Sequence, residues 1–377
     1  MNKILIVNNN MEVGGIQKSL LNLLKELAEE YDISIAFFSE SGELYNSIPE
    51  KIKIVQLSSI YKVLGLSKSR LKKSPFLFIT KAVCKIATPL FGKRNIIKIL
   101  GIFQKKIVDY DVVISYTHLT DNHTFDVGTA EFVIDKTSFN QKICFIHCDY
   151  KNSGFSSEYN NRFYSLFDKI ACCSDSVKNR LLEMAPELSG KTYTQRNFYD
   201  LSVVDCMGEE PIQYNNQFIT IVVVARLSVE KGILRFLRCI RETGRIDYRI
   251  YLIGDGPERG EIESFVENNN MHDMVSLKGE QSNPYKYMKN ADYLAQPSYH
   301  EAAPVVFDEA KALGLSVISS NTLSAVEMLG ENDIIFKDDE ELCKVLSVLE
   351  KPKKIMKTTL DNQLQIRQFS ELVDKNN

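Results

Sequence analysis

The chain has 377 residues, which is long for one compact core and suits two domains. Its apolar and charged fractions, 44% and 25%, are ordinary for a globular protein, and a formal net charge of −3 does not indicate nucleic acid or another polyanion as the main partner. The first residues, MNKILIVNNN, enter a strand at once instead of a signal peptide, and no apolar run reaches the roughly 18 residues that span a bilayer. We therefore expect a cytoplasmic protein with reduced thiols.

Strands and helices alternate through the first half of the chain. Residues 3–8 form an apolar run of strand length, and residues 16–27 repeat apolar side chains at helical spacing. Further strands are expected at residues 33–38, 112–116, 143–147 and 169–173. Such alternation indicates parallel, doubly wound sheets.

One segment of this half, residues 51–108, is strongly basic. It holds fourteen lysines and arginines and no acidic residue. Apolar residues recur at spacings of three and four, which predicts helices with one apolar face: Phe76, Ile79, Val83, Ile86 and Leu90, then Ile96, Leu100, Phe103 and Ile107. Two interpretations stay open: core helices with solvated lysines, or a patch within residues 62–106 that docks on an anionic membrane surface.

Residues 197–217 interrupt the pattern with Asp, Gly, Pro and Asn. Strands then resume at residues 218–224, 248–253, 274–277, 292–295 and 316–319. We expect an N-terminal domain at 1–197, a linker at 198–217, a C-terminal domain at 218–350, and a helical segment at 351–377 that packs back toward the N-terminal domain. A ligand of two such domains would lie between the carboxyl ends of their strands.

The loop after the strand at 218–224 carries Arg226 and Lys231 where a helix begins. Two cations beside a helix N-terminus suit a diphosphate, because arginine offers a fork of donors, lysine a point charge, and the helix end its free N–H groups. An exposed loop with ordinary surface charges is the alternative.

Residues 253–263, IGDGPERGEIE, indicate a second strand, glycine-rich turn and helix. Gly254 and Gly256 begin the pattern GxGxxG, but Arg259 stands at the third glycine. The segment therefore predicts a tight turn near the ligand, and it excludes a dinucleotide fingerprint and with it a two-domain dehydrogenase.

Glu301 and Glu309 flank the start of a third predicted helix, near Pro304. The helix N-terminus would face the same ligand as Glu301, and Glu309 lies one to two turns further in. Carboxylates accept hydrogen bonds from vicinal hydroxyls, so a sugar and a ribose are natural partners. A helix cap and an unrelated surface glutamate are the alternative.

In this order, VARLSVEKG, GDGPER and NPYKYMKNADYLAQPSYHEAAPVVFDEA resemble the retaining glycosyltransferases of family 4. VGGIQKSLLNLLKEL is similar to that family's glycine-rich first loop, and RNFYD to the residues leading into its linker. The resemblance is strongest over residues 218–330. It implies the GT-B fold, an α/β architecture in which two doubly wound Rossmann-like domains face each other across a cleft.

The resemblance also implies roles for single residues. Arg226 and Lys231 would hold the donor diphosphate, with Glu301 by the donor sugar and Glu309 by the ribose. The implied donor-binding residues are Gly14, Gly15, Arg226, Lys231, Gly254, Gly279, Ala302, Ala303, Pro304, Val305 and Glu309. Ala302 replaces a usual glycine and Gln17 a common acidic residue, which leaves the donor sugar open.

His118, just past the strand at 112–116, is the candidate to orient or deprotonate an acceptor hydroxyl, and His147 is its rival. A structural histidine is the alternative for each. The candidate catalytic residues are thus Arg226, Lys231, Glu301 and His118.

We expect no metal and no other cofactor. The sequence Asp109-Tyr110-Asp111 has Asp-x-Asp spacing, but it precedes a strand instead of following one. Cys144, His147 and Cys148 have no second Cys/His pair at zinc-site spacing.

The implied activity is metal-independent, retaining transfer of a hexose or N-acetylhexosamine from a nucleotide-diphosphate sugar, with UDP favoured. The acceptor would be a glycan or a polyprenyl-linked glycan in the synthesis of bacterial surface polysaccharide, either capsule or lipopolysaccharide. A nucleotide-sugar 2-epimerase of the same architecture and a non-catalytic nucleotide-sugar-binding subunit stay open. If the basic segment docks on lipid, the protein would attach peripherally to the inner face of the cell membrane.

Overall fold

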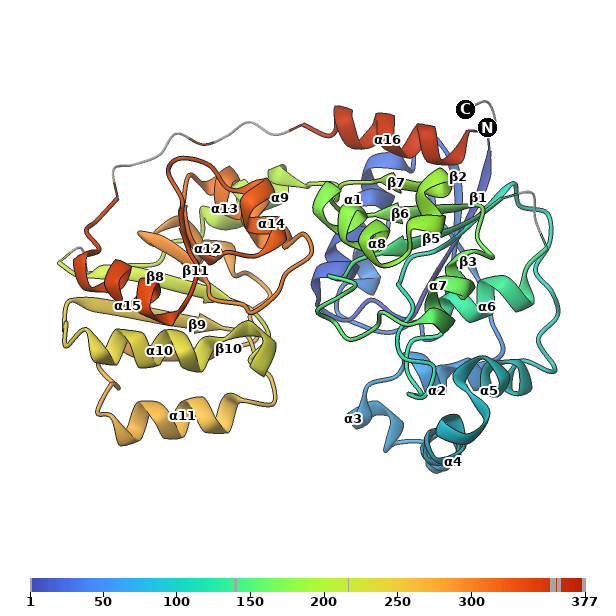
Figure 1. The fold of residues 1–377 in the computed structure, drawn as a ribbon, viewed down its shortest axis with the longest axis horizontal. Helices are drawn as coiled ribbons and strands as arrows, with labels where there is room; N and C mark the ends of the chain where they lie inside the picture. Colours follow the sequence, from blue (N-terminus) through green and yellow to red (C-terminus); the bar gives the residue numbers. More distant parts are fainter. Residues whose placement is uncertain (1, 139–140, 216, 353–356, 358–360, 375–377) are drawn as a thin grey trace. The chain divides into compact units, whose positions relative to one another are not determined.

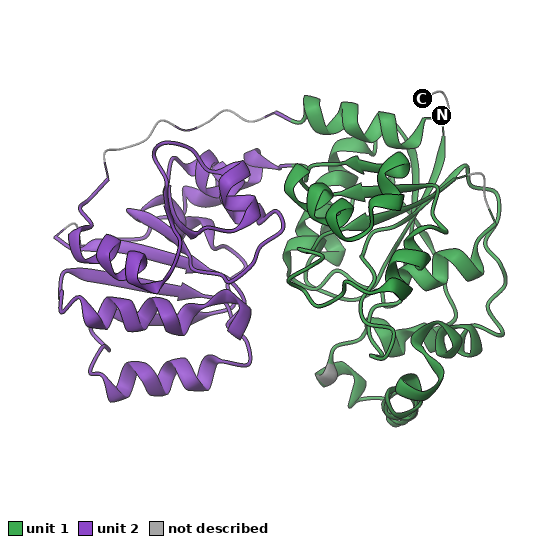
Figure 2. Ribbon diagram, viewed as in Figure 1, with its two compact units in different colours: residues 1–198, 362–377 green, residues 199–361 purple. Residues whose placement is uncertain are grey.

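The computed structural model describes residues 2–138, 141–215, 217–352, 357 and 361–374. It divides into two compact units, residues 1–198 with 362–377, and residues 199–361 (Figure 2). Each unit has helices on both faces of one parallel sheet (Figure 1). The predicted class, α/β with two Rossmann-like domains, is confirmed. Among the described helices, none combines the length and the apolar character needed to cross a bilayer.

Unit 1 is built on a seven-stranded sheet with the order β3-β2-β1-β4-β5-β6-β7. The strands are β1 Lys3–Asn8, β2 Asp32–Phe37, β3 Lys53–Val55, β4 Val112–Ser115, β5 Gln141–Ile146, β6 Lys169–Cys172 and β7 Thr192–Thr194. The strand order reverses direction between β1 and β4. The loops that follow these two strands therefore diverge, which makes this point of the sheet edge the natural ligand site of the unit.

The helices of unit 1 are α1 Gly15–Leu27, α2 Lys62–Gly65, α3 Lys68–Leu71, α4 Pro75–Phe91, α5 Lys93–Leu100, α6 Thr129–Lys136, α7 Glu158–Tyr164, α8 Asp175–Met184 and α16 Gln363–Val373. Short 3-10 turns lie at η1 Tyr45–Ser47, η2 Ser59–Tyr61 and η3 Pro186–Lys191. The helical spacing of Leu20, Leu24 and Leu27 places all three on one face of α1, where they are fully buried against the sheet.

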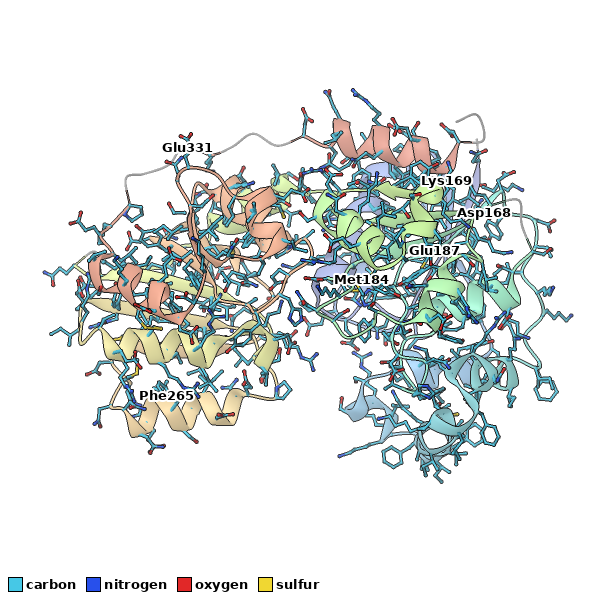
Figure 3. The ribbon with its side chains drawn as sticks, viewed as in Figure 1. Asp168, Lys169, Met184, Glu187, Phe265 and Glu331 are labelled. Atoms are coloured by element: carbon cyan, nitrogen blue, oxygen red, sulfur yellow. A yellow bond between two sulfur atoms is a disulfide. The ribbon has the colours of Figure 1, made fainter. Side chains whose placement is uncertain are left out.

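The last helix, α16, belongs to unit 1 although the chain reaches it from unit 2. Phe369 and Val373 are fully buried in the core of unit 1. Figure 3 labels Lys169, which lies at the start of β6. Its Nζ donates to the carbonyl oxygens of Glu371 and Leu372 at 2.7 and 2.9 Å. Through these contacts, α16 packs against residues of unit 1 that lie far from it in the sequence. Much of the stretch before α16 lies outside the described residues.

Unit 2 is built on a six-stranded parallel sheet with the order β10-β9-β8-β11-β12-β13. The strands are β8 Ile219–Val224, β9 Tyr248–Ile253, β10 Val275–Gly279, β11 Tyr293–Gln296, β12 Ser316–Ser320 and β13 Ile334–Phe336. The helices are α9 Leu201–Gly208, the 3-10 turn η4 Val229–Lys231, α10 Ile233–Glu242, α11 Arg259–Asn268, α12 Tyr285–Lys289, α13 Val305–Leu313, α14 Leu323–Met328 and α15 Asp339–Val348. Here the strand order reverses between β8 and β11.

The range expected to be a linker contains the helix α9. Asp200 caps it, because its side chain accepts a hydrogen bond from the backbone N–H of Val203. Val204 is buried in the core of unit 2 together with Met288 and Leu313. The turn-forming residues on both sides of α9 concealed a short helix that packs as part of the second unit.

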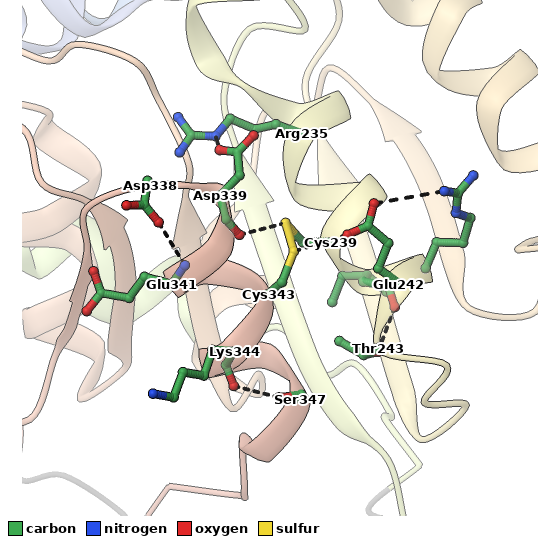
Figure 4. The surroundings of a disulfide bond; sticks show 12 residues. Arg235, Cys239, Glu242, Thr243, Asp338, Asp339, Glu341, Cys343, Lys344 and Ser347 are labelled. Atoms are coloured by element: carbon green, nitrogen blue, oxygen red, sulfur yellow. Dashed lines mark hydrogen bonds and ion pairs between the residues drawn. A yellow bond between two sulfur atoms is a disulfide. The ribbon is translucent and has the colours of Figure 1, made fainter.

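A disulfide joins Cys239 on α10 to Cys343 on α15 (Figure 4). The expectation of reduced thiols is therefore wrong for this pair. The two residues are 104 positions apart, and only the packing of α10 beside α15 brings their Cα atoms to 4.8 Å. The remaining cysteines of the described residues form no disulfide.

Candidate active site

The loops that follow β8 and β11 lie on either side of the point where the strand order of unit 2 reverses. The first loop holds Arg226 and Lys231, and the second holds Glu301. Parallel strands bring their carboxyl ends to one edge of the sheet, so the two loops meet although seventy residues separate them. Three of the predicted catalytic residues thus lie where this topology places a ligand.

Glycines allow the loops of unit 2 to approach each other closely. Gly232 has a φ of 63°, and a Cβ atom on it would lie 2.2 Å from the carbonyl oxygen of Pro297. Gly254 has a φ of 140°, and its Cβ atom would lie 1.9 Å from the carbonyl oxygen of Ala225. No other residue fits either position without displacing the backbone.

Backbone hydrogen bonds hold this arrangement together. The N–H of Leu227 donates to the carbonyl of Asp255 at 3.0 Å, and the N–H of Tyr299 donates to the carbonyl of Glu230 at 2.9 Å. The N–H of Gly254 donates to the carbonyl of Gly279, which ends β10, at 2.8 Å. The turn predicted near Gly254 is therefore tied to the loop after β8 and to the last residue of β10.

Lys231 and Glu301 form an ion pair, with Nζ 2.6 Å from Oε1. The same carboxylate oxygen accepts hydrogen bonds from Nε2 of Gln296 and Oγ of Ser298, each at 2.6 Å. Glu301 keeps 10% of its side chain exposed, and no described residue donates to its other oxygen, Oε2. Three donors thus fix one oxygen, and the second accepts no hydrogen bond from the described residues.

This cluster was only partly predictable. The sequence motifs indicate Lys231 and Glu301 separately, but not that they pair. Gln296 and Ser298 were missed, although both are buried at the end of β11. The available signal was their position: polar residues directly after an apolar parallel strand stand at the edge where ligands bind.

Arg226 is exposed at the end of β8, and it forms no ion pair with a carboxylate of the described residues. Its charge nevertheless acts on Glu230 nearby. Burial would raise the pKa of Glu230, but the hydrogen bond from Ser228 and the charges of Lys231 and Arg226 outweigh burial and lower it. The two cations of the loop thus lie beside two carboxylates, because Lys231 pairs with Glu301 and both cations act on Glu230, and Arg226 is left as the cation without an ion pair among the described residues.

The helix α13 begins at Val305, next to the predicted start at Pro304. Ala302 is largely buried and Ala303 is half-buried between Glu301 and the helix. A helix leaves its first N–H groups without partners inside the helix, and these groups favour an anion or a sugar oxygen at this end.

Glu309 lies on α13 with only 5% of its surface exposed, and its Oε1 accepts a hydrogen bond from the hydroxyl of Tyr285 at 2.8 Å. Tyr285 belongs to α12 and was not among the predicted site residues. Its hydroxyl holds the carboxylate in place from a neighbouring helix.

In unit 1 the predicted residues follow the strands next to its own point of reversal, β1 and β4. Gly14 precedes α1 in extended backbone, and Gly15 starts the helix. A Cβ atom on Gly14 would lie 2.7 Å from the side-chain oxygen of Gln17, whereas Gly15 has open space around it. Of these two glycines, Gly14 has a close neighbour within the unit, and that neighbour is the end of a flexible side chain.

His118 and His147 follow the adjacent strands β4 and β5. Burial, together with the charge of Lys93, lowers the pKa of His118 to about 4. Burial and the charge of His118 lower the pKa of His147 to about 3. Both rings are therefore neutral at pH 7, and no described residue pairs with Nδ1 of His118 or Nε2 of His147. Both of these nitrogens are buried, and the choice between His118 and His147 as the residue that serves an acceptor stays a prediction.

Residues 209–359, nearly the whole of unit 2, match the family described as glycosyl transferases group 1. This part, less than half of the whole chain, is similar to that family. It contains Arg226, Lys231, Glu301 and Glu309. The resemblance to glycosyltransferases noted in the sequence is therefore confirmed, and the matched residues include 218–330, where that resemblance is strongest.

Curated relatives agree with this assignment. The chain is 26% identical over 166 residues to an uncharacterized glycosyltransferase of Methanocaldococcus jannaschii, across 42% of this chain and 41% of the relative. It is 25% identical over 189 residues to the N-acetylgalactosamine-N,N'-diacetylbacillosaminyl-diphospho-undecaprenol 4-alpha-N-acetylgalactosaminyltransferase of Campylobacter jejuni, across 49% of this chain and 51% of the relative. The aligned part spans about half or less of these curated proteins.

Solved structures extend the likeness to the whole chain at the level of fold. Anabaena HepE, in complex with UDP and glucose, has a TM-score of 0.65 at 16% identity, over 92% of this chain and 89% of that chain. WaaG, a glycosyltransferase involved in lipopolysaccharide biosynthesis, has a TM-score of 0.54 at 14% identity, over 91% and 89%. The two units thus have the GT-B fold of these proteins.

Proposed function

We propose that the protein is a retaining glycosyltransferase that moves a hexose or N-acetylhexosamine from a UDP-sugar to a glycan or polyprenyl-linked acceptor of a bacterial surface polysaccharide. The observation that carries the proposal is the cluster around Glu301. Its Oε1 is held by Lys231, Gln296 and Ser298, and its Oε2 is left for the donor. A lysine that already contacts this carboxylate would stand between the sugar and the diphosphate.

The difficult step is cleavage of the bond between the anomeric carbon and the diphosphate oxygen. Negative charge develops on the departing diphosphate, so cations that are already in place stabilise the transition state more than the ground state. Arg226 and Lys231 would supply this charge without a divalent metal. Loss of one such donor typically costs roughly 3–4 kcal/mol, or a factor of hundreds in rate.

Glu301 would accept hydrogen bonds from the hydroxyls of the donor sugar, and Glu309 would serve the ribose. The backbone from Ala302 to Val305 would contact the sugar at the start of α13, and Gly254 and Gly279 would keep the turn near the nucleotide free of side chains. Gly14 and Gly15 would do the same in the N-terminal unit.

Relatives support the donor and acceptor classes. HepE was solved with UDP and glucose, and the Campylobacter jejuni relative is named for transfer to a diphospho-undecaprenol-linked sugar. For this chain we propose a UDP-sugar donor and an acceptor of that kind. A neutral His118 would orient the acceptor hydroxyl or take its proton.

The test is a donor panel assayed with and without acceptor. UDP-linked hexoses and N-acetylhexosamines are screened for a rise in the thermal midpoint, because a ligand that binds only the folded state stabilises it. The stabilising donor is then incubated with a membrane extract that contains lipid-linked oligosaccharide. Labelled sugar should enter the acceptor fraction even when EDTA is present. The new linkage should keep the α configuration of the donor.

Other outcomes would refute particular parts of the proposal. Isomerised donor in the absence of acceptor would show an epimerase. Binding without any release of UDP would show a non-catalytic subunit. Activity lost in EDTA and restored by manganese would refute the metal-free scheme, and an inverted product would refute retention.

A further inference from the structure

Helix α4 carries its apolar row on the outside of the molecule. The five residues spaced at three and four positions are between 59% and 77% exposed: Phe76, Ile79, Val83, Ile86 and Leu90. Its buried residues are the smaller Cys84 and Thr88. The interpretation of this row as part of the core is therefore wrong, because the periodicity marks a face that points away from the protein.

More exposed apolar side chains stand nearby in the chain. Ile99 in α5 is 66% exposed, and Ile102 and Phe103 just after it are 70% and 90% exposed. Ile96 and Ile97 in the same helix are buried, so α5 also contributes to the packing of unit 1. Figure 1 shows α3, α4 and α5 together at one end of unit 1. So large an exposed apolar surface is unusual on a globular protein and indicates a binding face.

Lysines accompany these apolar residues. The following are exposed and form no ion pair with a carboxylate of the described ranges: Lys72, Lys73, Lys85, Lys105 and Lys106. Not every basic residue of the segment contributes. Lys93 is buried 3.3 Å from Asp126, and Arg94 pairs with Asp135 at 2.9 Å. The cations that face solvent are thus a subset of the basic residues: Lys85 lies on α4 itself, on another face than the apolar row, and the other four precede α4 or follow α5 in the chain.

The positive charge of this segment distinguishes between two partners that could cover the apolar face, a second copy of the chain and a lipid surface. In a second copy of the chain, the same face would bring lysines against lysines, because residues 51–108 contain no acidic side chain. An anionic lipid surface accepts both components: apolar side chains enter the boundary of the acyl chains and lysines meet the head groups. We propose that α4 and the end of α5 dock unit 1 on an anionic bilayer.

The docking face is tied to the candidate acceptor side of unit 1. Lys93 starts α5 and donates to Thr120, which belongs to the loop after β4 that also carries His118. Docking would hold this loop close to the lipid surface, where a lipid-linked acceptor is found. This consequence rests on the proposed function, whereas the docking itself does not.

The experiment measures co-sedimentation of the full chain with vesicles of phosphatidylcholine alone and of equal phosphatidylcholine and phosphatidylglycerol. No donor or acceptor is added, so failure of docking and failure of the proposed function are separate results. Wild type should bind the anionic vesicles, bind the neutral ones much less, and be released by high salt.

Two triple variants test the two components. Lys85→Gln with Lys105→Gln and Lys106→Gln should lower the partition coefficient about fivefold per lysine. Ile79→Gln with Ile86→Gln and Leu90→Gln should lower it roughly tenfold per residue. All six positions are exposed, so each variant should keep the wild-type thermal midpoint.

Matched controls change three lysines and three aliphatic residues elsewhere. They are Lys151→Gln with Lys337→Gln and Lys344→Gln, and Ile246→Gln with Val326→Gln and Val348→Gln, all exposed. The controls should partition as wild type does. Equal binding of wild type and the docking-face variants would overturn the proposal. So would a wild-type dimer that binds no vesicle and dissociates in the apolar variant, because the occupant would then be a second copy.

Discussion

Gly254→Ala is expected to destabilise unit 2 strongly, because the new Cβ atom would lie 1.9 Å from the carbonyl oxygen of Ala225. Alanine at a φ of 140° costs about 1–3 kcal/mol in backbone strain. Relief of the overlap requires the loop after β8 to move, which adds about 1–3 kcal/mol, as overpacking does. We therefore expect a loss of about 2–6 kcal/mol, a large part of the stability of a typical domain.

Gly260→Ala is the matched control, since Gly260 lies on α11 with no atom within 4 Å of the added Cβ. Alanine in a helix should raise stability by about 0.5–1 kcal/mol. Urea unfolding, followed by a probe in unit 2, compares the three proteins. If Gly254→Ala unfolds at the wild-type midpoint, the close approach that joins the turn to the Arg226 loop is not present.

Three further predictions concern pH, the disulfide and the buried tyrosine. Since the pKa of His118 is lowered from 6.5 to about 4, the unfolded chain binds a proton that the folded chain does not between these values, and stability should fall by up to about 3 kcal/mol as pH drops through this window. Urea unfolding at pH 7 and pH 4.5 should show a smaller fall in His118→Gln. Cys343→Ser opens a loop of 104 residues and should lower stability by about 4–5 kcal/mol in non-reducing denaturation, whereas Cys206→Ser should change little; equal loss in both would contradict the disulfide. Tyr285→Phe removes a donor from Glu309 and should cost about 1–3 kcal/mol in thermal unfolding, and an unchanged midpoint would remove Tyr285 from that role.

Much of this organisation follows from local patterns in the sequence. Apolar runs followed by turns locate β8 and β11, and parallel sheets carry their ligands at the carboxyl ends of such strands. Arg226, Lys231 and Glu301 could therefore be placed in one site from their positions after strands. Arg259 stands where the third glycine of GxGxxG would be, and this alone excluded a dinucleotide-binding fingerprint.

Contacts between distant residues could not be predicted in the same way. The bonds from Gln296 and Ser298 to Glu301 depend on how one loop folds back on itself, and no spacing rule reports that. The disulfide depends on two helices packing side by side. Periodicity likewise predicts an apolar face on α4, but it does not show whether that face packs in the core of the protein or points outward.

The central claim, that Arg226 and Lys231 neutralise the departing diphosphate, is tested most directly by single-turnover sugar transfer at saturating donor. Arg226→Ala and Lys231→Ala should each slow the chemical step by a factor of roughly 100–1,000, while the exposed control Lys337→Ala should transfer at the wild-type rate. A doubly substituted protein, neutral at 226 and 231, that still transfers sugar at the wild-type rate would contradict the account.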